Sequence, residues 1–106
     1  MATTNGYVGT LEAESRGAAR LWFGLTDDPG GSGWIKIGAN RAWFTMSMAS
    51  EDRPTHLAQL TLLLEAMRAG LHVAVSHGGA ASFNKRAPGD SFEVDGVRVL
   101  RTGLHF

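Results

Sequence analysis

The chain has 106 residues, which is enough for one domain with its own buried core, covering residues 1–106. Ten basic and ten acidic residues cancel, so the composition argues against a protein that binds nucleic acid through an excess of positive charge. The absence of cysteine excludes disulfides, thiolate nucleophiles and cysteine metal sites.

The first half of the chain predicts two β-hairpins. Tyr7–Ser15 and Ala19–Leu25 form the first, because apolar and polar residues alternate in the second of these segments. A Gly- and Pro-rich loop over Asp27–Gly33 follows. Trp34–Ile37 and Ala42–Met48 then form the second hairpin. Three residues of its second strand are expected to face the core, namely Phe44, Met46 and Met48.

One α-helix is predicted from Asp52 to Gly70. Ser50, Glu51 and Asp52 offer capping side chains at its start, and Gly70 favours the left-handed conformation that ends a helix. On a helical wheel, one broad apolar face is expected to cover the barrel, and it contains Leu57, Leu60, Leu63, Leu64 and Met67. A polar stripe of Thr61, Glu65 and Arg68 separates it from a second, weakly apolar face.

That second face carries Ala58, Leu62, Ala66 and Ala69. Two interpretations stay open. The alanines can simply favour helix formation, or their small side chains can allow a neighbouring subunit to approach closely in a symmetric homo-oligomer.

After the helix, Leu71–His77 is a predicted strand, and Phe92–Thr102 a hairpin that turns at Asp95-Gly96. Strands and helices do not alternate, which argues against a parallel α/β sheet. The order favours a mainly β protein with one α-helix, namely an OB-fold-like antiparallel barrel of five or six strands with the helix between its middle strands. Gly9 and Gly24 would help the strands to bend.

No motif for catalysis stands out. The histidines lack the spacing of metal ligands, and His72 and His77 fall on opposite faces of a strand. We therefore expect a protein that is not an enzyme and has no cofactor or metal. The N-terminus does not resemble a signal peptide, and no segment is apolar enough to span a membrane. The compartment stays open.

The tryptophans are the most suggestive side chains. Trp22 and Trp43 are expected on the strand face opposite the core, while Trp34 lies at the edge of a loop. Exposed tryptophan can anchor a subunit interface or stack on a ligand. We assign Trp22 and Trp43 to the interface, together with the alanine-rich helix face, and Trp34 to a ligand site. The neutral charge favours sugar or protein over nucleic acid.

Three segments carry a family resemblance: SRGAARLWFGLT, RAWFTMSM and THLAQLTLLLEAMRAGLHVAVSH. In order and length of elements, residues 7–103 resemble the B subunits of bacterial enterotoxins, the cholera-toxin-like OB-fold pentamers that bind cell-surface glycans. The resemblance implies a ring in which the helices line a pore and strands pair between subunits. It also implies a second, A-type subunit, and secretion if the chain is processed; otherwise the protein would be cytoplasmic.

Family members hold a terminal sugar with an aromatic residue followed by Asn and Lys, aided by an acidic loop before the helix. The resemblance therefore implies a carbohydrate site at Phe83, Asn84 and Lys85, with Glu51 as the acidic residue. The chain departs from the family in lacking its cysteine pair and in having phenylalanine where the family has tryptophan.

Two other functions stay open from the residues. One is a single-stranded nucleic-acid-binding OB domain, whose stacking and basic residues would be Trp22, Trp34, Trp43, Arg20, Lys36 and Arg41. The other is a purely structural assembly subunit whose tryptophans are buried between protomers.

Overall fold

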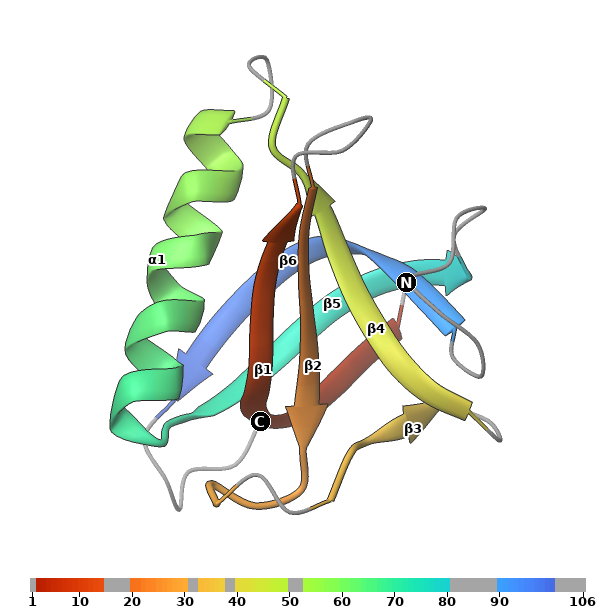
Figure 1. Cartoon of the computed structure of the whole chain (residues 1–106), viewed down its shortest axis with the longest axis vertical. Coiled ribbons are helices and arrows are strands. Elements are labelled where there is room, and N and C mark those ends of the chain that lie inside the picture. Colours follow the sequence, from red (N-terminus) through yellow and green to blue (C-terminus); the bar gives the residue numbers. More distant parts are fainter. Residues whose placement is uncertain are drawn as a thin grey trace.

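Five long strands close into a barrel in this computed structural model, which describes residues 2–14, 20–30, 33–37, 40–49, 53–80 and 90–100 (Figure 1). The elements are β1 (Ala2–Glu14), β2 (Arg20–Thr26), β3 (Lys36–Ile37), β4 (Asn40–Ser47), α1 (Arg53–Ala69), β5 (His72–Ala80) and β6 (Asp90–Leu100). The sheet order is β2-β1-β5-β6-β4-β3, and an additional β2–β4 pairing closes the barrel. The predicted class, mainly β with one helix between the middle strands, is confirmed.

One seam of the barrel is parallel. β4 and β6 run in the same direction over Ala42–Thr45 and Asp90–Glu93, whereas the other neighbouring strands are antiparallel. The prediction of a wholly antiparallel barrel is wrong at this seam, because α1 and β5 intervene between the two strands and return the chain to its starting end. A five-stranded barrel with one helix after its third long strand remains OB-fold-like.

Strand β1 is bent and belongs to both halves of the barrel (Figure 1). Residues 2–7 pair with β5, whereas residues 7–14 pair with β2. The register shifts between Val8 and Thr10, which places a β-bulge at Gly9, as the predicted bend requires. A Cβ atom at Gly9 would lie 2.4 Å from Cγ2 of Thr26, so a side chain does not fit there. The strand begins at Ala2, five residues before the predicted start.

The predicted hairpin at Asp95-Gly96 is wrong. Residues 90–100 form one continuous strand, in which Gly96 pairs with Ser76 on β5 and Val94 pairs with His77. Asp95 is the extra residue of a bulge, and Gly70 is the only residue with positive φ in the described part of the chain. The residues before and after Asp95-Gly96 pair with β5. They do not pair with each other, because β5 supplies a partner on both sides of the Asp-Gly pair. Thr102, the predicted end, lies outside the described residues.

The barrel core follows the predicted alternation in three strands. Side chains at every second position belong to the barrel core, namely Leu21, Phe23, Leu25, Phe44, Met46, Val73 and Val75. Met48 and Leu71 are partly buried and pack against this cluster. These positions were predictable because the period of two separates core-facing from outward-facing side chains in a strand.

Helix α1 ends as predicted, at Gly70, whose φ of +65° is the left-handed conformation. The amide of Leu71 donates to the carbonyl oxygen of Ala66, 2.9 Å away. At the other end of the helix, the side chain of His56 is hydrogen-bonded to the carbonyl of Ser47, which ties the first turn to the end of β4.

The side of α1 that faces the barrel differs from the predicted one. Leu63 and Ala66 are its most buried residues, with 0% and 1% exposed. The small Ala66 lets the helix approach the sheet closely, so Ala66 belongs to the core and the prediction that it lies in a subunit interface is wrong. Leu57, Leu64 and Met67, expected in the barrel, remain 43%, 51% and 42% exposed. Leu60 packs against the core as predicted.

Candidate ligand-binding site

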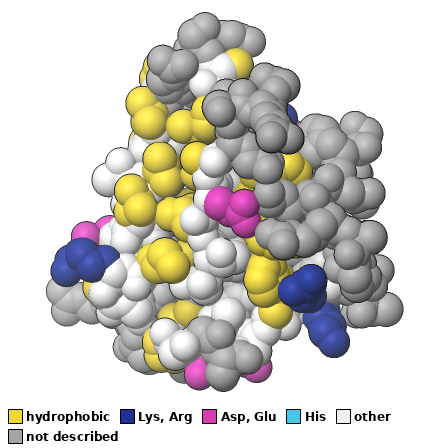
Figure 2. Space-filling view, in the orientation of Figure 1, with side chains coloured by type: hydrophobic (Ala, Val, Ile, Leu, Met, Phe, Trp, Pro, Cys, Tyr) yellow, Lys and Arg dark blue, Asp and Glu magenta, His cyan; other side chains and the backbone are white. Residues whose placement is uncertain are grey.

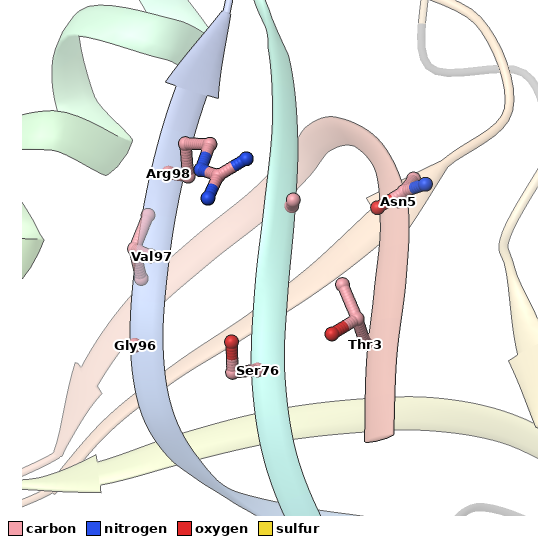
Figure 3. A pocket seen from close by; sticks show the side chains of 7 residues that line it. Thr3, Asn5, Ser76, Gly96, Val97 and Arg98 are labelled. Carbon is pink, nitrogen blue, oxygen red and sulfur yellow. The ribbon is translucent and has the colours of Figure 1, made fainter. Parts of the chain in front are cut away.

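A hollow of about 560 Å³ lies on the outer face of the sheet, where β1, β5 and β6 run side by side (Figure 3). Its lining residues are Thr3, Asn5, Ala74, Ser76, Gly96, Val97 and Arg98. The first half of β1 supplies two of them, so the hollow exists only because that half pairs with β5.

The hollow follows from the sizes of side chains in two cross-strand rows. Thr3 pairs with Ser76, which pairs with Gly96, and Asn5 pairs with Ala74, which pairs with Arg98. Residues that face each other across neighbouring strands lie on the same side of the sheet. Ala74, Ser76 and Gly96 are small, so they form a low floor between the longer side chains of Asn5 and Arg98.

The walls of the hollow carry directional polar groups. Thr3 and Ser76 bring hydroxyls, Asn5 an amide and Arg98 a guanidinium, and no carboxylate is among the lining residues. In Figure 3 the side chain of Arg98 extends from β6 toward β5, across the sheet surface. These groups both donate and accept hydrogen bonds, with an excess of donors.

An aromatic pair flanks the polar rows. Tyr7 and His72 are partners in the β1–β5 register, two residues along from Asn5 and Ala74. Their rings stack with centroids 4.8 Å apart and an angle of 22° between planes. Two residues along a strand span about 6.6 Å, so the aromatic pair lies one cross-strand row away from Asn5 and Ala74 on the same face of the sheet.

The other histidine of β5, His77, is a core residue. It is 2% exposed and lies between Phe44 and Phe92, with ring centroids 5.3 Å and 5.1 Å away. Its Nδ1 donates to the carbonyl of Gly78 at 2.9 Å, which leaves Nε2 to accept from the hydroxyl of Thr4 at 2.8 Å. The prediction that His72 and His77 lie on opposite faces is confirmed. The described residues contain no group of three or more acidic, histidine or cysteine side chains able to hold a metal ion.

The three tryptophans pack on the outer face of β2 and β4 and do not form an open stacking surface. Trp22 and Trp43 are only 4% and 3% exposed in a single protomer, so the prediction that they are exposed is wrong. The indole of Trp34 lies 4.7 Å from that of Trp43, centroid to centroid, and its Nε1 donates to the carbonyl of Ala42 at 3.0 Å. Arg41 covers the Trp34 ring at 5.1 Å. Trp34 thus stabilises the barrel.

Arg20 is also engaged within the protomer. Its Nη2 donates to Glu93 at 2.6 Å and its Nε to the hydroxyl of Thr45 at 3.0 Å, which links β2, β4 and β6 across the parallel seam. Of the six residues expected to bind nucleic acid, Trp22 and Trp43 are buried, and Arg20 and Arg41 contact groups of the same protomer. Trp34 is partly exposed and Lys36 is exposed, and a nucleic-acid site there stays a prediction.

The site implied by the family resemblance lies outside the described residues. Phe83, Asn84, Lys85 and Glu51 all belong to segments that the structure does not describe, so a sugar site there stays a prediction. The sequence prediction missed the residues of the hollow. The available signal was the alternation of small or polar residues with core valines in His72–His77, but the partners of that strand could not be known from it.

The comparisons with known proteins add no family. No protein-family model matches the chain, and no curated protein sequence matches it. Within the described residues, no helix has both the length and the apolar character needed to cross a membrane.

The contact between Gly24 and Trp34 tests how the tryptophans pack on the outer face of β2 and β4. A Cβ atom at Gly24 would lie 2.4 Å from Cζ2 of Trp34, so Gly24→Ala must displace an indole that is fixed by its hydrogen bond to Ala42. We expect a loss of about 1–3 kcal/mol in the free energy of unfolding, typical of overpacking, measured by urea denaturation with tryptophan fluorescence. The control is Gly78→Ala, whose Cβ meets no atom within 4 Å. Equal stability of the two variants would contradict the packing described.

Proposed function

We propose that this protein is a non-enzymatic carbohydrate-binding module whose ligand lies in the hollow formed by β1, β5 and β6. The supporting observation is the combination, in one hollow, of two hydroxyls, an amide and a guanidinium beside the Tyr7–His72 stack. A sugar needs several directional hydrogen bonds for its hydroxyls and an apolar surface for its ring face. The hollow offers the polar groups, and the Tyr7–His72 stack in the adjacent cross-strand row offers the aromatic surface.

OB-fold barrels bind oligosaccharides and oligonucleotides with the face of their second and third strands and with loops. Those strands correspond to β2 and β4, whose outer face is filled by Trp22 and Trp43, so the proposed site lies on a different face of the barrel. The usual nucleic-acid surface depends on exposed aromatic side chains and a basic groove. The burial of Trp22 and Trp43 and the net charge of zero therefore favour sugar over nucleic acid.

We further propose that the module is a ring-forming homo-oligomer that resembles a toxin B subunit. Four large apolar side chains of α1 support this: Leu57, Leu62, Leu64 and Met67, each 40–51% exposed. Figure 2 shows hydrophobic side chains along the surface of the helix. Large exposed apolar side chains gathered on one element are typical of protein interfaces.

The polar stripe divides this apolar surface into two flanks. Arg68 and Glu65 are paired at 2.5 Å, and this hydrogen bond lowers the pKa of the Glu65 carboxyl, so the stripe is charged and stays hydrated. Leu57, Leu64 and Met67 lie on one side of the stripe, and Leu62 lies on the other with Ala58 and Ala69. Two different flanks on one helix suit a head-to-tail contact, which forms a ring when the rotation between neighbouring subunits closes.

Filling the hollow tests the ligand site. Gly96→Val places its Cβ 3.8 Å from Oγ of Ser76, an ordinary contact, so the variant should fold while its side chain occupies the floor. On a glycan array, wild type should bind and Gly96→Val should lose at least about tenfold in affinity, because polar groups that bind the sugar become covered. Gly78→Val, on the same sheet where a Cβ meets no atom within 4 Å, is the matched control and should bind as wild type does.

If Gly96→Val binds the same glycans as tightly as wild type, the hollow is not the site. If folded wild-type protein binds no glycan, the proposed function itself is wrong.

Light scattering tests the assembly. Wild type should have several times the 11.3 kDa mass of one chain, and Leu64→Gln should shift it toward the monomer because a polar side chain replaces the most exposed of the four apolar ones. Thr61→Gln, on the polar stripe of the same helix, should keep the wild-type mass. A monomeric wild type, or an unaffected Leu64→Gln, would refute assembly through this helix.

A further inference from the structure

We infer that the hollow selects an acidic saccharide, one that carries a carboxylate or a sulfate ester, and that Arg98 is the residue that binds this group. The inference rests on the proposed carbohydrate function and adds the chemical class of the ligand. It follows from the position of Arg98, from the absence of acidic residues in the lining, and from the contrast with other arginines of the barrel.

Arg98 is the only charged residue among those that line the hollow. It pairs in register with Ala74, and Ala74 pairs with Asn5, so the guanidinium and the amide stand on either side of a methyl group. No ion pair connects Arg98 with another described residue. A guanidinium beside the methyl group of Ala74 matches a planar carboxylate or a sulfate through two parallel hydrogen bonds.

Other arginines of the barrel have local roles. Arg20 pairs with Glu93, Arg68 pairs with Glu65, and Arg41 lies over the ring of Trp34. In these places the positive charge is compensated by an acidic residue or an aromatic ring of the same protomer. At Arg98 the lining residues offer hydroxyls and an amide and no carboxylate, so an anion from outside is the complementary partner.

The remaining polar groups suit the neutral part of such a ligand. Thr3 and Ser76 form the adjoining cross-strand row and can exchange hydrogen bonds with sugar hydroxyls. The Tyr7–His72 stack lies beyond the Asn5 row, on the other side from Thr3. An acidic sugar in the hollow would therefore place its anionic group at Arg98 and its hydroxyls toward Thr3 and Ser76.

Matched sugars that differ in one group test this inference. The probes are methyl β-D-glucuronide against methyl β-D-glucoside, methyl β-D-galacturonide against methyl β-D-galactoside, and glucose 6-sulfate as the sulfate ester. Each is titrated against wild type, Arg98→Gln and Arg98→Lys by ligand-observed NMR at low ionic strength. Wild type should bind at least one of the acidic probes about tenfold more tightly than its neutral counterpart, as expected for a charge-assisted hydrogen bond.

Arg98→Gln should remove this preference, so that each acidic probe and its neutral counterpart bind with affinities within about twofold of each other. Arg98→Lys should retain part of it, because the charge is kept while the planar fork is lost. The carboxylate and sulfate probes then identify which anion is preferred.

The inference is overturned if wild type binds neutral and acidic probes equally, if Arg98→Gln keeps the acidic preference, or if none of the acidic probes binds. If, in that case, wild type binds neutral glycans and Gly96→Val abolishes that binding, the carbohydrate function is retained and only the acidic class of ligand is rejected. Circular dichroism of each variant establishes that the barrel is folded in every titration.

Discussion

The bend of β1 at Gly9 shapes both halves of the barrel. β1 lies between β5 and β2, and the bulge bends it between residues 2–7, which pair with β5, and residues 7–14, which pair with β2. The barrel closes on that side because of this bend. The same bend brings Thr3 and Asn5 beside Ser76 and Ala74, so one backbone feature both completes the core and assembles the hollow.

The two outer faces of the barrel differ because of the side chains that they carry. On β2 and β4, the indoles of Trp22 and Trp43 are buried, Trp34 packs over Trp43, and Arg20 bridges to Glu93. That face is filled within one protomer. On β1, β5 and β6, the central positions are Ala74, Ser76 and Gly96, so the surface is open between longer polar residues. The functional proposal follows from this contrast in side-chain size, since the backbone is a pleated sheet on both faces.

The sequence predicted the local features of the fold and missed those that depend on distant partners. The alternation in β2, β4 and β5 and the helix stop at Gly70 were predictable, because each depends on residues close in the chain. Asp95-Gly96 has the composition of a tight turn, but β5 provides a continuous partner and the segment stays extended. The helix offered two apolar faces, and its buried side combines Leu63 of the first with Ala66 of the second, which depends on how the helix sits on the sheet. The hollow joins Thr3 to Ser76, far apart in sequence, and no motif marks such a pairing.

A chemical-shift map of the backbone amides tests whether sugar binds on the β1–β5–β6 face. Isotope-labelled protein is titrated with a glycan that the array identifies. We predict that the largest shifts fall on residues of the two cross-strand rows, led by Thr3, Ser76 and Gly96, with smaller shifts at Tyr7 and His72. Shifts confined to Phe83, Asn84 and Lys85, with the rows unchanged, would contradict it and place the sugar where the toxin resemblance implies.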